Sequence, residues 1–290
     1  MDSDKLGTRY KQHAQLLFIQ LNKNLHICYM DKCKKCNAEL QGKFCANCGQ
    51  KVISTRYTVK ESVGWVFGSI FNLDHGFFYT SKLMLTKPGK VVNDFMNGVT
   101  VGYSHPFRFL FFWATISAII GAYFGAFEES GLVFNKMAGQ SEEEIARARK
   151  VMLFMKQYMS FIIMAFVPFS ALGSYLVLKP KKLNYAEHLI LNSYSTGIST
   201  AIGLPIVFAY AFTDNFNILS LLSFALGFLI IGRVYAKTFD DHYFVGVLRY
   251  LGSFLIGFAT LMIFIFVIAI VLAIASKSMG LDLFEGLKAQ

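Results

Sequence analysis

The stretch Leu251–Ala275, LGSFLIGFATLMIFIFVIAIVLAIA, contains 25 residues and no charged side chain. A run of about 20 mostly apolar residues is long enough to cross the hydrocarbon core of a bilayer as a helix. This stretch is the centre of a longer apolar run, and four other runs also qualify. The five predicted spans are Phe107–Phe127, Val151–Leu178, Leu189–Phe212, Phe216–Tyr235 and Val245–Ala275. The sequence therefore predicts an all-α polytopic membrane protein with about five transmembrane helices.

The overall composition agrees with that fold class. Of the 290 residues, 54% are hydrophobic and only 16% are charged, and the mean hydropathy is +0.46. Ordinary soluble domains carry about 25% charged residues. The composition excludes a disordered chain, a collagen-like chain and a small disulfide scaffold. Clustering of the apolar residues into long runs also excludes a wholly soluble fold.

The charge distribution predicts an orientation in the membrane. The net charge is +10, and residues 1–60 hold eleven basic residues against four acidic ones. Lys and Arg accumulate on the cytoplasmic side of membrane proteins, and the short loop 213–215 has neither. We therefore expect a multi-pass protein of the cytoplasmic (inner) membrane, with the N-terminus in the cytoplasm and the C-terminus outside. A basic arm can also bind nucleic acid, but the hydrophobic remainder favours the lipid bilayer as the partner.

Four of the five cysteines form two closely spaced CxxC motifs, CKKC at Cys33–Cys36 and CANC at Cys45–Cys48. Two such motifs can place four thiolates around one tetrahedral Zn²⁺, and the metal then stabilises a segment too small to fold alone. The alternative is a pair of disulfides, which requires an oxidising compartment. The sequence predicts one structural zinc ion per chain, bound by Cys33, Cys36, Cys45 and Cys48.

Local signals divide the chain further. Pro88 lies where a helix can begin and Gly98 where one can end, and Ser141 with Glu144 forms a capping box ahead of the second span. Apolar residues at helical spacing upstream of Pro88 indicate amphipathic helices on the membrane surface. The predicted order is a flexible arm (1–29), a zinc ribbon (30–54), amphipathic surface helices (55–104), a five-span bundle (105–277) and a C-terminal tail (278–290).

Three segments that follow the cysteine motifs are similar to a known family. These are FNLDHGF at Phe71–Phe77, KPGKV at Lys87–Val91 and HPFRF at His105–Phe109. With the preceding CxxC and FCxxCGQ motifs they resemble an uncharacterised bacterial membrane family, domain of unknown function 3667, over residues 33 to about 112. The chain departs from the family at Gly98–Tyr103, where the usual basic cluster is missing. The family implies no activity, and a weaker similarity to Yip1-type five-span proteins rests on architecture alone.

Two groups of polar residues could carry chemistry. Histidines and carboxylates near the predicted cytoplasmic face could form a second metal site or an acid–base pair. These residues are Asp74, His75, His188, Asp241 and His242. The alternative is that these side chains are solvated or structural. The third span carries polar residues on one helix face, which could line a cavity or bond between packed helices: Asn192, Ser195, Thr196 and Ser199.

These observations support three functional hypotheses. The first is a non-enzymatic scaffold, in which the zinc ribbon docks a protein partner and the bundle anchors it or handles lipid. The second is a channel or transporter that uses the polar face of the third span. The third is a metal-dependent membrane enzyme at the histidine cluster. The sequence does not decide whether the protein is an enzyme or an oligomer, although it lacks HExxH, GxSxG, P-loop and GxGxxG motifs.

Overall fold

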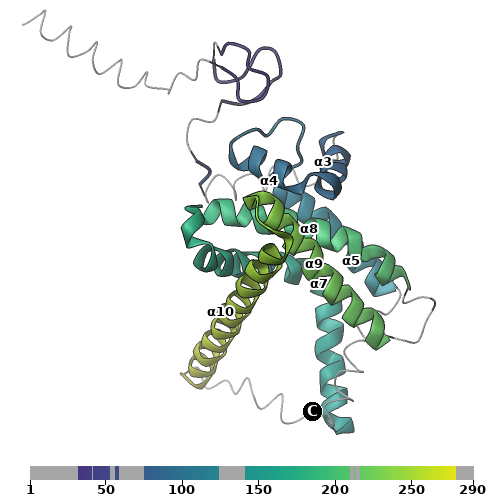
Figure 1. The fold of residues 1–290 in the computed structure, drawn as a ribbon. Coiled ribbons are helices and arrows are strands. Elements are labelled where there is room, and N and C mark those ends of the chain that lie inside the picture. Colours follow the sequence, from purple (N-terminus) through teal and green to yellow (C-terminus); the bar gives the residue numbers. More distant parts are fainter. Residues whose placement is uncertain are drawn as a thin grey trace, which may run out of the picture. The chain divides into compact units, whose positions relative to one another are not determined.

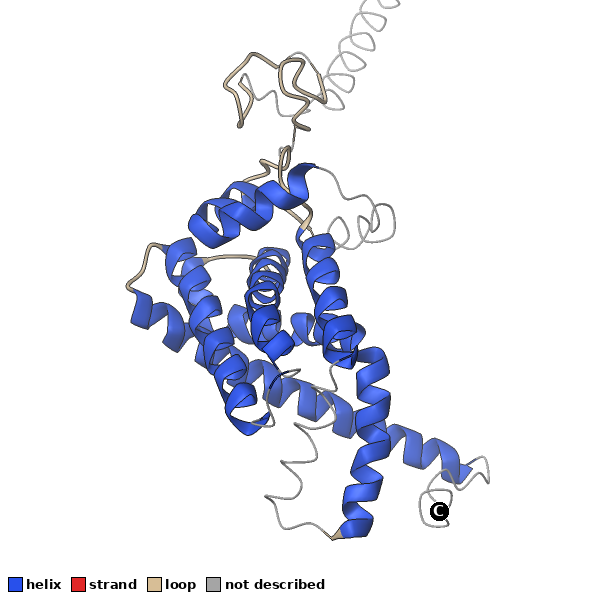
Figure 2. Ribbon diagram, turned by 90° about the vertical axis from the view of Figure 1, so that its right-hand side faces the viewer, coloured by secondary structure: helices blue, strands red, loops and turns tan. Residues whose placement is uncertain are grey.

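The computed structural model describes residues 32–40, 42–52, 56–58, 75–123, 141–209, 212 and 216–278. The chain forms two compact units: one comprises Met1–Arg56 with Asn97–Val101, and the other comprises Tyr57–Met96 with Gly102–Gln290. The predicted arm at 1–29, residues 59–74 of the predicted surface helices and the tail after Ser278 lie outside the described residues. Figure 2 shows that the described part of the second unit is helical.

The described ribbon consists of two turns with the same hydrogen-bond pattern. The N–H of Cys33 donates to the carbonyl of Ala38 at 2.8 Å, and the N–H of Cys45 donates to that of Gln50 at 2.9 Å. An isolated β-bridge closes each turn, one joining Lys32 to Glu39 and the other Phe44 to Lys51. Gly49 has a φ of 71°, which is the left-handed region where glycine is tolerated without strain. The ribbon is thus two copies of one turn.

Two short helices follow in the second unit, α3 (His75–Thr86) and α4 (Pro88–Met96). Helix α4 begins at Pro88 and ends just before Asn97–Gly98, so both predicted helix boundaries are confirmed. The apolar side chains of α4, including Val91, Val92 and Phe95, are buried, and α4 packs against α9 and α8. We expected the apolar face of α4 to lie on the membrane surface, whereas it packs against these two helices.

All five predicted spans are helices: α5 (Pro106–Tyr123), α7 (Glu142–Val177), α8 (Tyr185–Ala209), α9 (Phe216–Phe239) and α10 (Tyr243–Ser278). Four of them, α5, α7, α9 and α10, are long and apolar enough to cross a membrane, and α8 is not among these four. A short 3₁₀ turn, η1 (Lys179–Lys181), separates α7 from α8. The protein is therefore an all-helical polytopic membrane protein, in agreement with the predicted fold class.

The capping box predicted ahead of the second span is present. The Ser141 side chain accepts a hydrogen bond from the Glu144 N–H, and the Glu144 carboxylate accepts one from the Ser141 N–H at 2.8 Å. The first helical N–H groups have no partner within a helix, and the box satisfies two donors at this end. Helix α7 accordingly begins at Glu142, well before its apolar part.

Helix α8 lies at the centre of the second unit, in contact with α5, α7, α9, α4 and α3. Twelve of its residues between Ala186 and Ile198 are buried. Helices α7 and α10 cross closely, as Figure 1 shows, and a side chain at Gly173 would collide with the Ser253 carbonyl. On α9, the Arg233 guanidinium donates to the Leu85 carbonyl at 2.7 Å and so satisfies the end of α3. The bundle thus encloses the first half of α8 among the other helices.

Candidate functional site

The four cysteines predicted to bind zinc converge in the ribbon. Their sulfur atoms all lie within 4.8 Å of one another. The Cys33–Cys48 and Cys36–Cys45 sulfur pairs are each 3.6 Å apart, and all four thiols are free rather than disulfide-bonded. Four sulfurs bound at about 2.3 Å to one tetrahedral ion would be about 3.8 Å apart. The cluster therefore has the size and the donor set to hold a metal ion.

The electrostatics of the cluster restrict how many of its thiols can ionise together. The N–H of Ala38 bonds to the Cys36 sulfur and lowers the pKa of that thiol to about 6. The N–H of Gln50 acts in the same direction on Cys48, but desolvation and the neighbouring sulfurs outweigh it and raise the pKa of Cys48 to about 12. Adjacent thiolates repel one another, so they cannot all ionise without a compensating charge. A bound divalent cation would supply that charge and allow all four to deprotonate.

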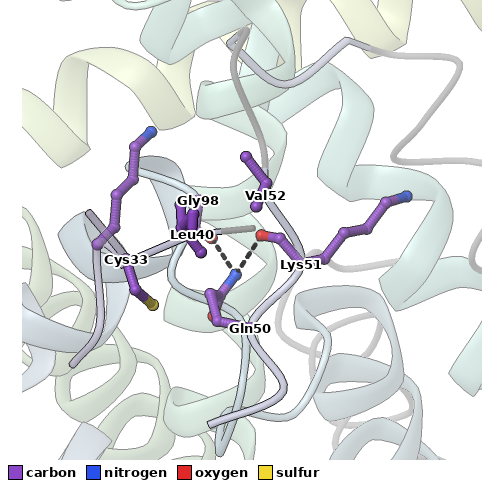
Figure 3. Close-up of a pocket in the computed structure, with 7 residues that line it drawn as sticks. Cys33, Leu40, Gln50, Lys51, Val52 and Gly98 are labelled. Carbon is purple, nitrogen blue, oxygen red and sulfur yellow. Dashed lines mark hydrogen bonds between the residues drawn. The ribbon is translucent and has the colours of Figure 1, made fainter. Parts of the chain in front are cut away.

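A small, shallow pocket lies beside the cysteines. Gln50 contributes its buried carboxamide to this pocket, as Figure 3 shows, and bonds there to the carbonyls of Lys51 and Gly98. Sequence reasoning missed Gln50 because glutamine carries no metal-binding or catalytic signature. Its position directly after Cys48–Gly49 was the only available signal.

The second predicted metal site is only partly described. Asp74 lies outside the described residues, and of His75 only the backbone is described. The other three members have separate partners. His188 bonds to Ser174, Asp241 pairs with Arg249 and lies 3.5 Å from Lys181, and the His242 Nδ1 accepts from the Phe244 N–H at 3.4 Å. Within the described ranges, the four cysteines are the only close group of three or more His, Cys, Asp or Glu ligands. The five-residue site remains a prediction.

A buried polar cluster joins three helices of the bundle around Asn192, which is 1% exposed. The Asn192 Oδ1 accepts from the hydroxyls of Ser170 at 2.7 Å and Tyr235 at 2.9 Å. Its Nδ2 donates to the Ser174 Oγ at 2.9 Å, and that oxygen lies 2.9 Å from the Nδ1 of His188. The sequence signalled Asn192 and His188, but it did not identify Ser170, Ser174 and Tyr235 as their partners.

The predicted polar face of α8 separates into different environments. Asn192 bonds to α7 and α9, whereas the Ser195 hydroxyl donates to the Leu191 carbonyl on its own helix at 2.7 Å. Thr196 and Ser199 are partly buried, and a side chain at Gly227 of α9 would lie 3.3 Å from the Ser199 Oγ. The Nε2 of His188 is buried without a hydrogen-bond partner in the part of the chain that the structure describes. The contacts at Asn192 favour helix packing as its role.

The fold and the cysteine cluster together define an all-helical membrane protein with an N-terminal group of four cysteines able to hold a metal ion. Residues 74–118 match the model of a family described as a protein of unknown function (DUF3667). This match confirms the resemblance read from the sequence, and it includes α3, α4 and most of α5. No curated protein and no solved structure matches the chain.

Proposed function

We propose that this protein is a non-enzymatic module of the cytoplasmic membrane, in which a zinc ribbon docks a protein partner and the helical bundle anchors the ribbon in the bilayer. A scaffold or lipid-handling role follows from that arrangement. The observation that carries the proposal is the cluster of four cysteines. Catalytic zinc sites keep one position open for water or substrate, whereas four cysteine ligands fill a tetrahedral shell. The zinc in this site would be structural.

The surface of the ribbon supports docking. Phe44 is 59% exposed, although aromatic side chains of that size are usually more buried in a folded protein. The neighbouring Lys43 and the bridge partner Lys51 are also exposed. An exposed aromatic residue with one lysine beside it in the sequence and another across the bridge suits contact with an acidic protein surface, because aromatic anchors and charge complementarity both favour association.

Purification in mild detergent tests the docking proposal. Proteins that co-purify with the wild type should be lost from Cys45→Ser, because that substitution removes a metal ligand and the ribbon should unfold. They should be retained by Cys28→Ser, which changes the one cysteine outside the cluster. Loss from both variants, or retention by both, would contradict docking through the ribbon.

Reporter fusions test the proposed orientation. A reporter active only in the cytoplasm should work when fused after residue 30 or Lys182, and should fail after Asn215 or Gln290. The physical reason is the distribution of Lys and Arg over the loops. Activity of the Gln290 fusion would mean an even number of spans, and α8 would then be the helix that does not cross.

The two other hypotheses have less support from the described contacts. A transport pathway along α8 requires polar groups open to water, whereas the Asn192 carboxamide is bonded to other side chains. An enzyme at the histidines requires His188 to be accessible, whereas its side chain is fully buried. Substrate-dependent flux or turnover in reconstituted protein would overturn the proposal.

A further inference from the structure

Gln50 connects the ribbon to the segment Asn97–Val101, which belongs to the same compact unit. Its side chain is 3% exposed. The Nε2 donates to the Gly98 carbonyl at 2.7 Å, as Figure 3 shows. The Oε1 accepts from the N–H groups of Thr100 at 3.0 Å and Val101 at 3.1 Å. One carboxamide therefore satisfies three main-chain groups of a segment that is about fifty residues away in the sequence.

Two lysines of the first cysteine turn bind the same segment. The Lys34 Nζ donates to the Asn97 carbonyl at 3.0 Å, and the Lys35 Nζ donates to the Val101 carbonyl at 2.8 Å. Like the shortest Gln50 bonds, these end on main-chain atoms. These contacts therefore depend on the backbone conformation of residues 97–101 more than on the side chains of those residues.

The second cysteine turn sets the position of Gln50. The Gln50 carbonyl accepts from the Cys45 N–H at 2.9 Å, and its own N–H bonds to the Cys48 sulfur. Ala38 occupies the equivalent place in the first turn, with its carbonyl bonded to the Cys33 N–H at 2.8 Å. The methyl group of alanine has no donor or acceptor, so only the second turn can bind the segment in this way.

We infer that metal binding by the four cysteines controls the conformation of residues 97–101, the segment that joins α4 to α5, and that Gln50 is the positioning residue that couples the two. This inference rests on the bound metal of the proposed function. When the metal is removed, the turn that holds the Gln50 backbone loses the ion that stabilises it. The Thr100 and Val101 amides then lose their acceptor and become open to water.

Hydrogen–deuterium exchange of the full chain in detergent tests the coupling. We expect peptides covering residues 97–102 to exchange slowly in the zinc-loaded protein and about tenfold faster or more after chelation, because each amide loses a buried hydrogen bond. Gln50→Ala should exchange fast even in zinc, while its zinc content stays at the wild-type value. Glu39→Ala, an exposed change in the other half of the ribbon, should leave both quantities unchanged.

A second test measures how residues 97–101 affect the binding of zinc by the cysteines. If metal binding stabilises the segment, the segment must stabilise the metal by the same factor. Thr100→Pro removes the N–H that donates to Gln50 and the hydroxyl that accepts from its Nε2 at 3.4 Å, without changing the cysteine turns. We expect this variant to lose zinc to a competing chelator at a lower chelator concentration than the wild type. Val99→Ala, in the same segment, should behave like the wild type.

The outcomes separate this inference from the proposed function. Wild-type protein without zinc would contradict both. Zinc-loaded protein whose 97–102 peptides exchange at the same rate before and after chelation would overturn only the coupling. If Gln50→Ala loses its zinc, hydrogen exchange in that variant no longer tests the coupling, and chelator competition with Thr100→Pro tests it instead. Unchanged zinc retention by Thr100→Pro would then overturn the inference.

Discussion

Cys45→Ser is expected to reduce the zinc content of the purified protein from about one ion per chain to near zero. Cys45 is 2% exposed, and its sulfur lies 3.6 Å from that of Cys36. A serine hydroxyl is a hard, weakly acidic ligand and does not replace a thiolate in a zinc site. The free energy of metal binding in such a small domain is largely its folding free energy, about 10 kcal/mol or more. Elemental analysis of the purified protein measures the change.

The bundle should survive the loss of the ribbon. Each transmembrane helix inserts because of its own hydrophobicity, so Cys45→Ser protein should still be found in the membrane fraction. Limited proteolysis should cut the variant between residues 32 and 52 and leave the wild type intact there. Cys28→Ser serves as the matched control and should retain zinc. Wild-type protein without zinc, or with two native disulfides among these cysteines by mass spectrometry, would contradict the prediction.

Asn192→Ala is expected to give the largest loss of stability among single changes on the polar face of α8. The substitution deletes the carboxamide that joins α7, α8 and α9, and it leaves the buried hydroxyls of Ser170 and Tyr235 without that acceptor. Hydrogen bonds between membrane helices contribute about 0.6 kcal/mol each on average. Three such bonds, to Ser170, Ser174 and Tyr235, give about 2 kcal/mol, which lowers the melting temperature by about 4–8 °C in a bundle of this size. Thermal unfolding in detergent measures the shift.

Ser195→Ala is the matched control for the Asn192 variant. Both residues lie on the same helix and are buried, but within the described residues the Ser195 hydroxyl bonds only to a carbonyl of its own helix. We expect its melting temperature to stay within about 1–2 °C of the wild type, since such a bond contributes little to tertiary stability. Equal shifts in the two variants would contradict a packing role for Asn192. That result would favour a hydrated face, where water replaces the lost bonds.

Short-range patterns predicted much of the local structure. Pro88 begins α4, the Ser141–Glu144 box begins α7, and each apolar run forms a helix. These signals work because the first turn of a helix and the length of a span depend on neighbouring residues alone. The cysteine spacing predicted the metal cluster for the same reason, since each CxxC pair is held by its own short turn.

Long-range partners could not be read from the sequence. Asp241 was grouped with the histidines, yet it pairs with Arg249 on α10 and with Lys181 in η1. Arg233 lies near the end of the predicted span Phe216–Tyr235, yet its guanidinium donates to a carbonyl at the end of α3. A charged side chain near a helix end can reach lipid, water or another helix, and only the packing of the helices decides among these.

The sequence by itself determined the membrane class, the helix positions and the cluster of four cysteines able to hold a metal ion, because hydrophobic length, capping and CxxC spacing are local properties of the chain. The tertiary structure alone decided that the polar face of α8 is the centre of the bundle and that Gln50 binds residues 97–101. Contacts of this kind join segments far apart in the sequence. Their partners are chosen by the packing of the whole chain, which no local pattern encodes.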